Sequence, residues 1–116
     1  MLIPGNVEVW LAVEPVSLLK SIDGLCAEVE RRFAVDPMKG HVFLFLNRTR
    51  TGVKLLYWDT GGFVLTYKRL ERGRFQVPVV RGDRAQLTGA QLAALLEGID
   101  LSRARRVPLW NPAPIA

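Results

Sequence analysis

The sequence contains one cysteine, one histidine and no long apolar run, and each scarcity excludes a class of protein. Cys26 alone cannot form a disulfide framework or a cysteine zinc site within one chain. No apolar run approaches the roughly 18 residues of a membrane-spanning helix. The start, MLIPGNVEVW, lacks the basic region and the long apolar region of a secretory signal. We therefore expect a cytoplasmic protein.

Groups for catalysis are also few. His41 begins an apolar strand pattern and Cys26 lies on the apolar stripe of a helical pattern, so both are interpreted as structural residues. No glycine-rich phosphate loop of the GxxxxGK type is present. The remaining candidates are carboxylates scattered over turns and a helix end: Asp59, Glu71, Asp83 and Asp100. A two-metal site needs several carboxylates aimed at one point, so we expect no enzyme, no metal and no cofactor.

The 116 residues, 49% of them hydrophobic, are enough for one domain with a core and too few for two. The formal net charge of +5 is unevenly distributed. Residues 1–47 carry a net −2, residues 48–84 a net +6, and residues 85–116 a net +1. A basic block between nearly neutral ends favours an anionic partner, although arginine-rich surfaces also serve solubility.

Hydrophobic periodicity predicts a single α+β domain: an antiparallel β-meander of about five strands, with one helix after the first strand and one C-terminal helix. The clearest strand patterns are 7–13, 41–47, 53–58 and 63–70, and Gly73 marks a further turn before RFQVP. The run 41–47 is apolar on both parities, which suits a central strand covered on both faces.

Two helices are expected from their apolar stripes and their caps. The first has Ser17 as its N-cap and extends through Phe33. The second begins with a capping-box pattern, Thr88 and Gln91, and ends near Gly98. The domain is expected to span 1–101, and the proline-containing residues 102–116 are expected to form an extended or disordered tail.

Consecutive antiparallel hairpins place alternate turns at the same end of a sheet. The turns 48–52 and 71–74 should therefore share one end, with the turn 59–62 at the other. A symmetric hairpin there pairs Trp58 with Phe63, Leu56 with Leu65 and Lys54 with Tyr67. Seven cations are then expected to converge at the first end: Arg48, Arg50, Lys54, Lys68, Arg69, Arg72 and Arg74.

The positive side chains of such a cluster repel one another, and Glu71 is the only counter-charge expected among them. Arginine is well suited to bidentate phosphate contacts, so the cluster predicts binding to the backbone of a nucleic acid rather than base-specific readout. In the alternative, these side chains pair with Glu28, Glu30 or Asp83, or their stems cover apolar surface. Tyr67, beside Lys54, is interpreted as a packing residue rather than a base-stacking one.

Four segments resemble one known family in order and spacing, from about residue 3 to residue 101. They are KSIDGL (20–25), DPMKGHVFLF (36–45), VKLLYWDTGGFVLTYKRLERGRF (53–75) and LTGAQLAALLEGID (87–100). Together they resemble the TnpB-type accessory protein of the insertion sequence 66 (IS66) transposon family. Only the name is shared with RNA-guided TnpB nucleases, which are far longer.

The resemblance implies a bacterial mobile element and a separate, larger transposase that carries the catalytic carboxylates. The family's recurring positions map onto Lys20, Asp23, Gly24, Asp36, Pro37, Gly40, His41, Lys54, Trp58, Asp59, Lys68, Arg69, Leu70, Gly73, Phe75, Glu97 and Gly98. This chain departs from the usual MRKGFDGL at Leu19, Ser21 and Ile22, so the start of the first helix lacks an arginine there. Lys20 and Asp23 are spaced to pair on a helix surface.

Two functions from different classes follow. The first is a non-catalytic accessory protein for transposition that binds the DNA of transposon ends and contacts the transposase. The second is a protein–protein adaptor that docks the transposase, or a second copy in a homo-oligomer, without touching DNA. In that case Leu109 and Trp110 in the tail would act as a docking peptide.

Overall fold

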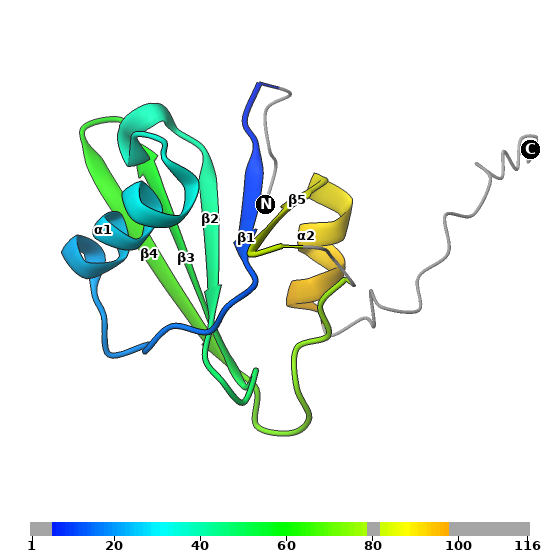
Figure 1. The fold of residues 1–116 in the computed structure, drawn as a ribbon. Helices are drawn as coiled ribbons and strands as arrows, with labels where there is room; N and C mark the ends of the chain where they lie inside the picture. Colours follow the sequence, from blue (N-terminus) through cyan, green and yellow to red (C-terminus); the bar gives the residue numbers. More distant parts are fainter. Residues whose placement is uncertain (1–5, 79–81, 98–116) are drawn as a thin grey trace, which may run out of the picture.

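The computed structural model describes residues 6–78 and 82–97, which form a five-stranded sheet with helices on both faces (Figure 1). The strands lie in the order β4-β3-β2-β1-β5. The elements are β1 (Val9–Ala12), α1 (Ile22–Phe33), the 3-10 helix η1 (Pro37–Lys39), β2 (Val42–Leu46), β3 (Gly52–Asp59), β4 (Gly62–Arg69), β5 (Arg84–Leu87) and α2 (Gly89–Leu96).

The α+β class, the helix after the first strand and the C-terminal helix are confirmed, and the sheet is mostly antiparallel. The meander, however, covers only β2, β3 and β4. β1 pairs with β2 in parallel because α1 carries the chain back to the starting end of the sheet. β5 pairs with β1 rather than β4, because the segment after β4 crosses one face of the sheet and places Phe75 in the core there.

The core has one layer on each face of the sheet. On one side, Leu25, Val29 and Phe33 of α1 pack against Phe43 and Phe45 of β2. On the other side, the alternate strand residues pack against Leu92 and Leu95 of α2 and against Phe75. All five residues of β2 are buried, which confirms the prediction of a central strand covered on both faces.

The first helix begins later than expected. Its N-cap is Ser21, and residues 17–20 form a turn in which the Leu19 amide donates to Ser17 Oγ at 3.2 Å. The prediction of Ser17 as the N-cap was wrong because a serine hydroxyl can close a local turn as readily as it caps a helix. The capping box of Thr88 and Gln91 at the start of α2 is confirmed. Gly98, like the tail 102–116, lies outside the described residues.

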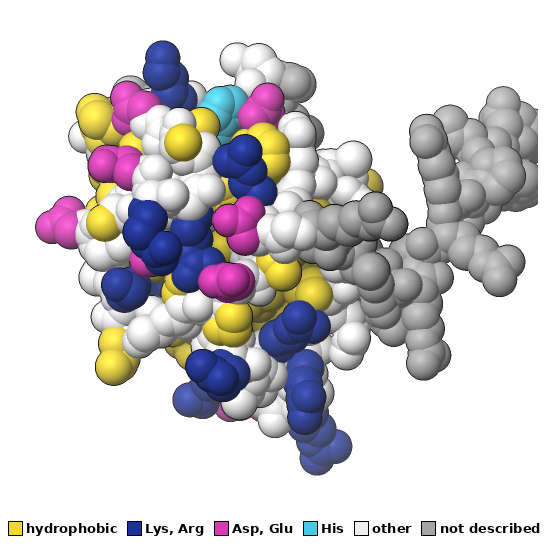
Figure 2. Space-filling view, in the orientation of Figure 1, with side chains coloured by type: hydrophobic (Ala, Val, Ile, Leu, Met, Phe, Trp, Pro, Cys, Tyr) yellow, Lys and Arg dark blue, Asp and Glu magenta, His cyan; other side chains and the backbone are white. Residues whose placement is uncertain are grey.

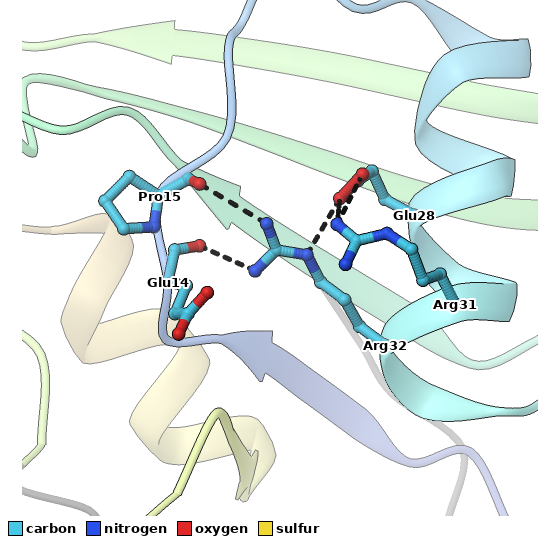
Figure 3. A network of polar contacts seen from close by, with 5 residues as sticks. All are labelled: Glu14, Pro15, Glu28, Arg31 and Arg32. Atoms are coloured by element: carbon cyan, nitrogen blue, oxygen red, sulfur yellow. Dashed lines mark hydrogen bonds and ion pairs between the residues drawn. The ribbon is translucent and has the colours of Figure 1, made fainter.

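A polar network fastens the β1–α1 connection to α1 (Figure 3). Glu28 is buried, and it accepts hydrogen bonds from Arg32 Nε at 2.8 Å and from Arg31 Nη2 at 2.9 Å. Arg32 also donates to the backbone carbonyls of Glu14 and Pro15, at 2.9 and 3.3 Å. Burial alone would raise the pKa of Glu28, but the hydrogen bonds from Arg32 and Arg31 outweigh it and hold the pKa below its ordinary value. We call these three side chains the Glu28 clamp.

Within the described ranges, no helix has the length and apolar character needed to cross a membrane.

Candidate nucleic-acid interface

Two loops meet at one end of the sheet, as the hairpin order predicts. They are 47–51, between β2 and β3, and 70–75, after β4, and both lie at the lower end of Figure 1. Two backbone hydrogen bonds of 2.7 Å join them, from Leu70 N to Thr51 O and from Phe75 N to Arg50 O. The predicted register of β3 with β4 is also correct, including the pairs Trp58–Phe63 and Lys54–Tyr67. The two loops therefore form a single hydrogen-bonded unit.

The 47–51 loop is shaped by Asn47, a residue that is not among the candidates predicted from the sequence. Its Oδ1 accepts from the amides of Thr51 and Gly52 at 3.0 and 3.1 Å, and its Nδ2 donates to Thr51 Oγ1 at 3.2 Å. This arrangement turns the chain tightly enough to place Arg50 at φ 58, in the left-handed region. The signal was present in the sequence, because asparagine before a Thr- and Gly-containing turn commonly makes such bonds.

The 70–75 loop is held at both ends by apolar side chains. Phe75 is 1% exposed within the core of the α2 face, and Leu70 packs against the same cluster. Gly73 has φ 75, so the turn between them needs a residue that tolerates the left-handed region. Arg72 and Arg74 flank that glycine and are exposed. The packing of Leu70 and Phe75 thus fixes the backbone positions of Arg72 and Arg74.

Five arginines belong to this unit and its adjoining strand end, and we call them the basic pole: Arg48, Arg50, Arg69, Arg72 and Arg74. Figure 2 shows Lys and Arg side chains gathered at the corresponding lower end of the molecule. All five residues are exposed. Only Arg69 forms an ion pair, with Glu71 at 3.1 Å; the other four make no side-chain hydrogen bond or ion pair with any described residue. The hydrogen bond that Arg69 donates to Glu71 raises the pKa of Arg69 above its ordinary value.

Lys54 and Lys68, the other two cations expected in the cluster, are used elsewhere. They lie on opposite faces of the sheet, because Lys54 pairs with Tyr67 whereas Lys68 pairs with Val53 of the α2-side core. Lys54 Nζ donates to the backbone carbonyl of Lys20 at 2.8 Å, and Lys68 Nζ donates to that of Leu96 at the end of α2. The structure therefore brings together five of the seven cations and gives the two lysines backbone partners.

Pairing with distant carboxylates does not account for the basic pole within the described residues. Glu28 pairs with Arg31 and Arg32 instead.

Tyr67 is 54% exposed, with Lys54 Nζ 5.8 Å from its ring centroid. The ring lies against Gly52, where an added Cβ would come within 3.0 Å of Tyr67 Cε1 and 2.7 Å of Leu18 Cδ1. Tyr67 is therefore only partly a packing residue.

The family-motif residues occupy several places in the fold. Gly73 and Phe75 shape the loop of the basic pole, as described above. At the far end of the sheet, Trp58 packs edge-on against Phe63 with ring centroids 5.0 Å apart, and Asp59 opens the β3–β4 turn. Asp23 and Gly24 lie in the first turn of α1. Lys20 precedes the helix and forms no ion pair with Asp23, so the expected surface pair is wrong.

The candidate catalytic groups have structural surroundings. His41 Nδ1 accepts a hydrogen bond from the Glu8 amide at 3.0 Å. Cys26 packs against the α1-face cluster, and burial, with the nearby Asp23 and Glu30 charges, raises its thiol pKa, which disfavours a thiolate nucleophile. Across residues 6–78 and 82–97, no group of three or more His, Cys, Asp or Glu side chains could hold a metal ion.

Comparison with known proteins gives consistent matches over most of the chain. The sequence model of the family described as IS66 Orf2 like protein matches residues 7–106. Two uncharacterized proteins of Sinorhizobium fredii are similar: y4hO, 32% identical over 95% of this chain and 94% of its own length, and y4jC, 29% identical over 96% and 95%. No solved structure matches.

Proposed function

Because this chain belongs to the IS66 Orf2-like family of transposition accessory proteins, we propose that it is a non-catalytic subunit that binds the phosphates of DNA through its basic pole. One observation carries this proposal. Two hydrogen-bonded loops and the end of β4 hold five exposed arginines and, among the described residues, one exposed carboxylate, that of Glu71.

The basic pole has the properties that a phosphate backbone requires. A guanidinium group presents a planar fork of donors that matches phosphate oxygens, and each neutralised phosphate releases counterions. The mutual repulsion of exposed cations costs several tenths of a kcal/mol per close pair, and four of the five have no internal partner among the described residues to offset it. An external polyanion offsets that repulsion.

The proposed contacts position the protein rather than read a sequence. Phosphate contacts fix register and orientation without carrying base information. We therefore assign to this protein the holding of transposon-end DNA, and to a separate transposase the cleavage and joining of strands. The raised thiol pKa of Cys26 and the hydrogen-bonded Nδ1 of His41 support a non-catalytic role.

A salt titration of binding to duplex DNA tests the proposal. Log K of the wild-type chain should fall linearly with log salt, and Arg72→Gln/Arg74→Gln should reduce the slope by about 0.9 for each phosphate that the variant no longer neutralises. The matched control is Arg31→Gln/Lys39→Gln, which removes the same charge elsewhere and leaves Arg32 on Glu28; its slope should stay unchanged. Glu71→Gln should strengthen binding because it frees Arg69 from its ion pair.

The outcomes separate the proposal from the adaptor alternative. No DNA binding by the wild type even at low salt, or equal slope changes in the two double variants, would contradict the proposal. If such a chain still co-purifies with the transposase, and does so through Arg72 and Arg74, the basic pole meets an acidic protein surface instead.

A further inference from the structure

β4 forms an edge of the sheet and is the more regular of the two edge strands. Its eight residues pair with β3 in one unbroken antiparallel register from Gly62 to Arg69, without a bulge. Among the described residues, no strand lies on its outer side. An unpaired edge presents a row of backbone N–H and C=O groups that another strand can bind.

The first six residues of β4 carry none of the usual protection of an edge. The stretch GFVLTY contains no proline and no charge, and Phe63, Val64 and Leu65 are half-buried rather than covered. Charged residues appear only at the last two positions, Lys68 and Arg69. By contrast, β5 at the other edge has four residues and begins with a cation, Arg84. The edge at β4 is therefore the one open to pairing.

We propose that β4 pairs antiparallel with β4 of a second copy of this chain, which makes a continuous ten-stranded sheet. A twofold axis perpendicular to the sheet keeps the α1 faces of both copies on the same side. Directly opposed residues must then point to the same face of the sheet. The axis therefore lies midway between the two β4 strands, at the level of one residue that faces its own copy. An axis at Leu65 opposes Leu65 to itself and Phe63 to Tyr67 of the second copy, and it keeps nearly the whole strand paired.

Charge favours this partner and this direction. The antiparallel arrangement brings Lys68 and Arg69 of each copy beside the β3–β4 turn of the other. That turn, residues 59–62, carries the carboxylate of Asp59 and no cation. The basic poles of the two copies then lie at opposite ends of the paired β4 strands, which reduces their mutual repulsion. A parallel arrangement would place the two poles side by side.

Sedimentation equilibrium of the full chain tests the inference. An interface of eight residues per copy is at the small end of specific interfaces, so the dimer should form with protein concentration over the micromolar range. Thr66→Lys should weaken dimerisation at least about tenfold, because it places two cations near each other beside Val64 at the axis. The matched control is Gln86→Lys, which adds the same charge on β5 and should leave the dimer intact. Circular dichroism checks that both variants are folded.

Disulfide cross-linking tests the register. In a Cys26→Ala background, Leu65→Cys should form an intermolecular disulfide on oxidation, because directly opposed residues lie about 4.5–5.5 Å apart at Cα. Thr66→Cys should cross-link less, and Gln86→Cys should not. A wild-type chain that stays monomeric throughout the concentration range would overturn the inference. So would a dimer that Thr66→Lys leaves unchanged, or cross-linking through Gln86→Cys in place of Leu65→Cys. None of these results depends on DNA binding.

Discussion

Two arginines in different regions of this protein pair with carboxylates that differ in solvent exposure. Arg31 of the Glu28 clamp and Arg69 of the basic pole have the same side-chain exposure, 65%, and each pairs with one carboxylate. The carboxylate of Glu28 is only 9% exposed and is shared with Arg32, whereas that of Glu71 is 76% exposed. A buried charge needs its partners for the fold to be stable, whereas an exposed pair contributes little.

Some arginines of this protein have internal partners, and others have none among the described residues. Arg32 donates to Glu28 and to two backbone carbonyls, and Arg84 donates to the carbonyl of Phe33 at the end of α1. Arg48, Arg50, Arg72 and Arg74 have no such partners in the described part of the chain. Stability should therefore depend on the first group and polyanion binding on the second.

The largest expected effect is in the clamp. Glu28→Gln leaves one acceptor oxygen for two guanidinium groups, so the free energy of unfolding should fall by about 2–4 kcal/mol. Urea unfolding followed by circular dichroism measures this. Glu30→Gln, an exposed change on the same helix, should shift the free energy by less than about 0.5 kcal/mol. Equal effects of the two variants would remove the distinction between buried and exposed carboxylates.

The Glu28 clamp should also make the stability of the fold depend on pH. The pKa of folded Glu28 lies below its ordinary value of 4.5, so the folded state binds fewer protons there than the unfolded state. The stability from Glu28 is therefore complete above about pH 4.5 and is lost as the pH falls through the folded pKa. The difference in unfolding free energy between wild type and Glu28→Gln should shrink on acidification from about pH 6 to about pH 3. A constant difference would mean that the charge of Glu28 is unimportant.

The smallest expected effect on stability is in the basic pole. Arg50 lies in the left-handed region, so Arg50→Gly relieves backbone strain while it removes a charge. The free energy of unfolding should stay the same or rise by up to about 1 kcal/mol, and the salt slope of DNA binding should fall by about 0.9. Thr60→Gly, another positive-φ residue at the far end of the sheet, is the control for backbone relief alone. An identical salt slope for Arg50→Gly and wild type would exclude Arg50 from the contact.

Local patterns predicted much of the fold. Alternation and turn residues predicted β2, β3, β4 and the register between β3 and β4, because each hairpin depends on neighbouring residues. Neither the position nor the partner of β5 was predicted, because the pattern placed the strand after Gly73 in RFQVP, whereas the fifth strand is Arg84–Leu87. Its pairing with β1 depends on Phe75 and Leu70 packing beneath the sheet, which involves contacts distant in sequence.

The candidate site was predictable at the level of loops and less so at the level of side chains. Hairpin order predicted that 48–52 and 71–74 share one end, and the backbone hydrogen bonds show it. The hydrogen-bond partners of Lys54 and Lys68 were not predictable from the sequence. Their acceptors are the backbone carbonyls of Lys20 and Leu96, which are at least 28 residues away along the chain. Asn47 was missed because its role appears only when its amide meets the backbone of Thr51 and Gly52.

The sequence by itself determined the charge imbalance along the chain, the apolar periods of strands and helices, and the family, because each is a property of residue order. The tertiary structure alone decided which arginines are neutralised internally and which remain exposed together. The reason is that a guanidinium group binds whatever acceptor the fold brings within about 3 Å, and the distances along the chain do not determine that acceptor.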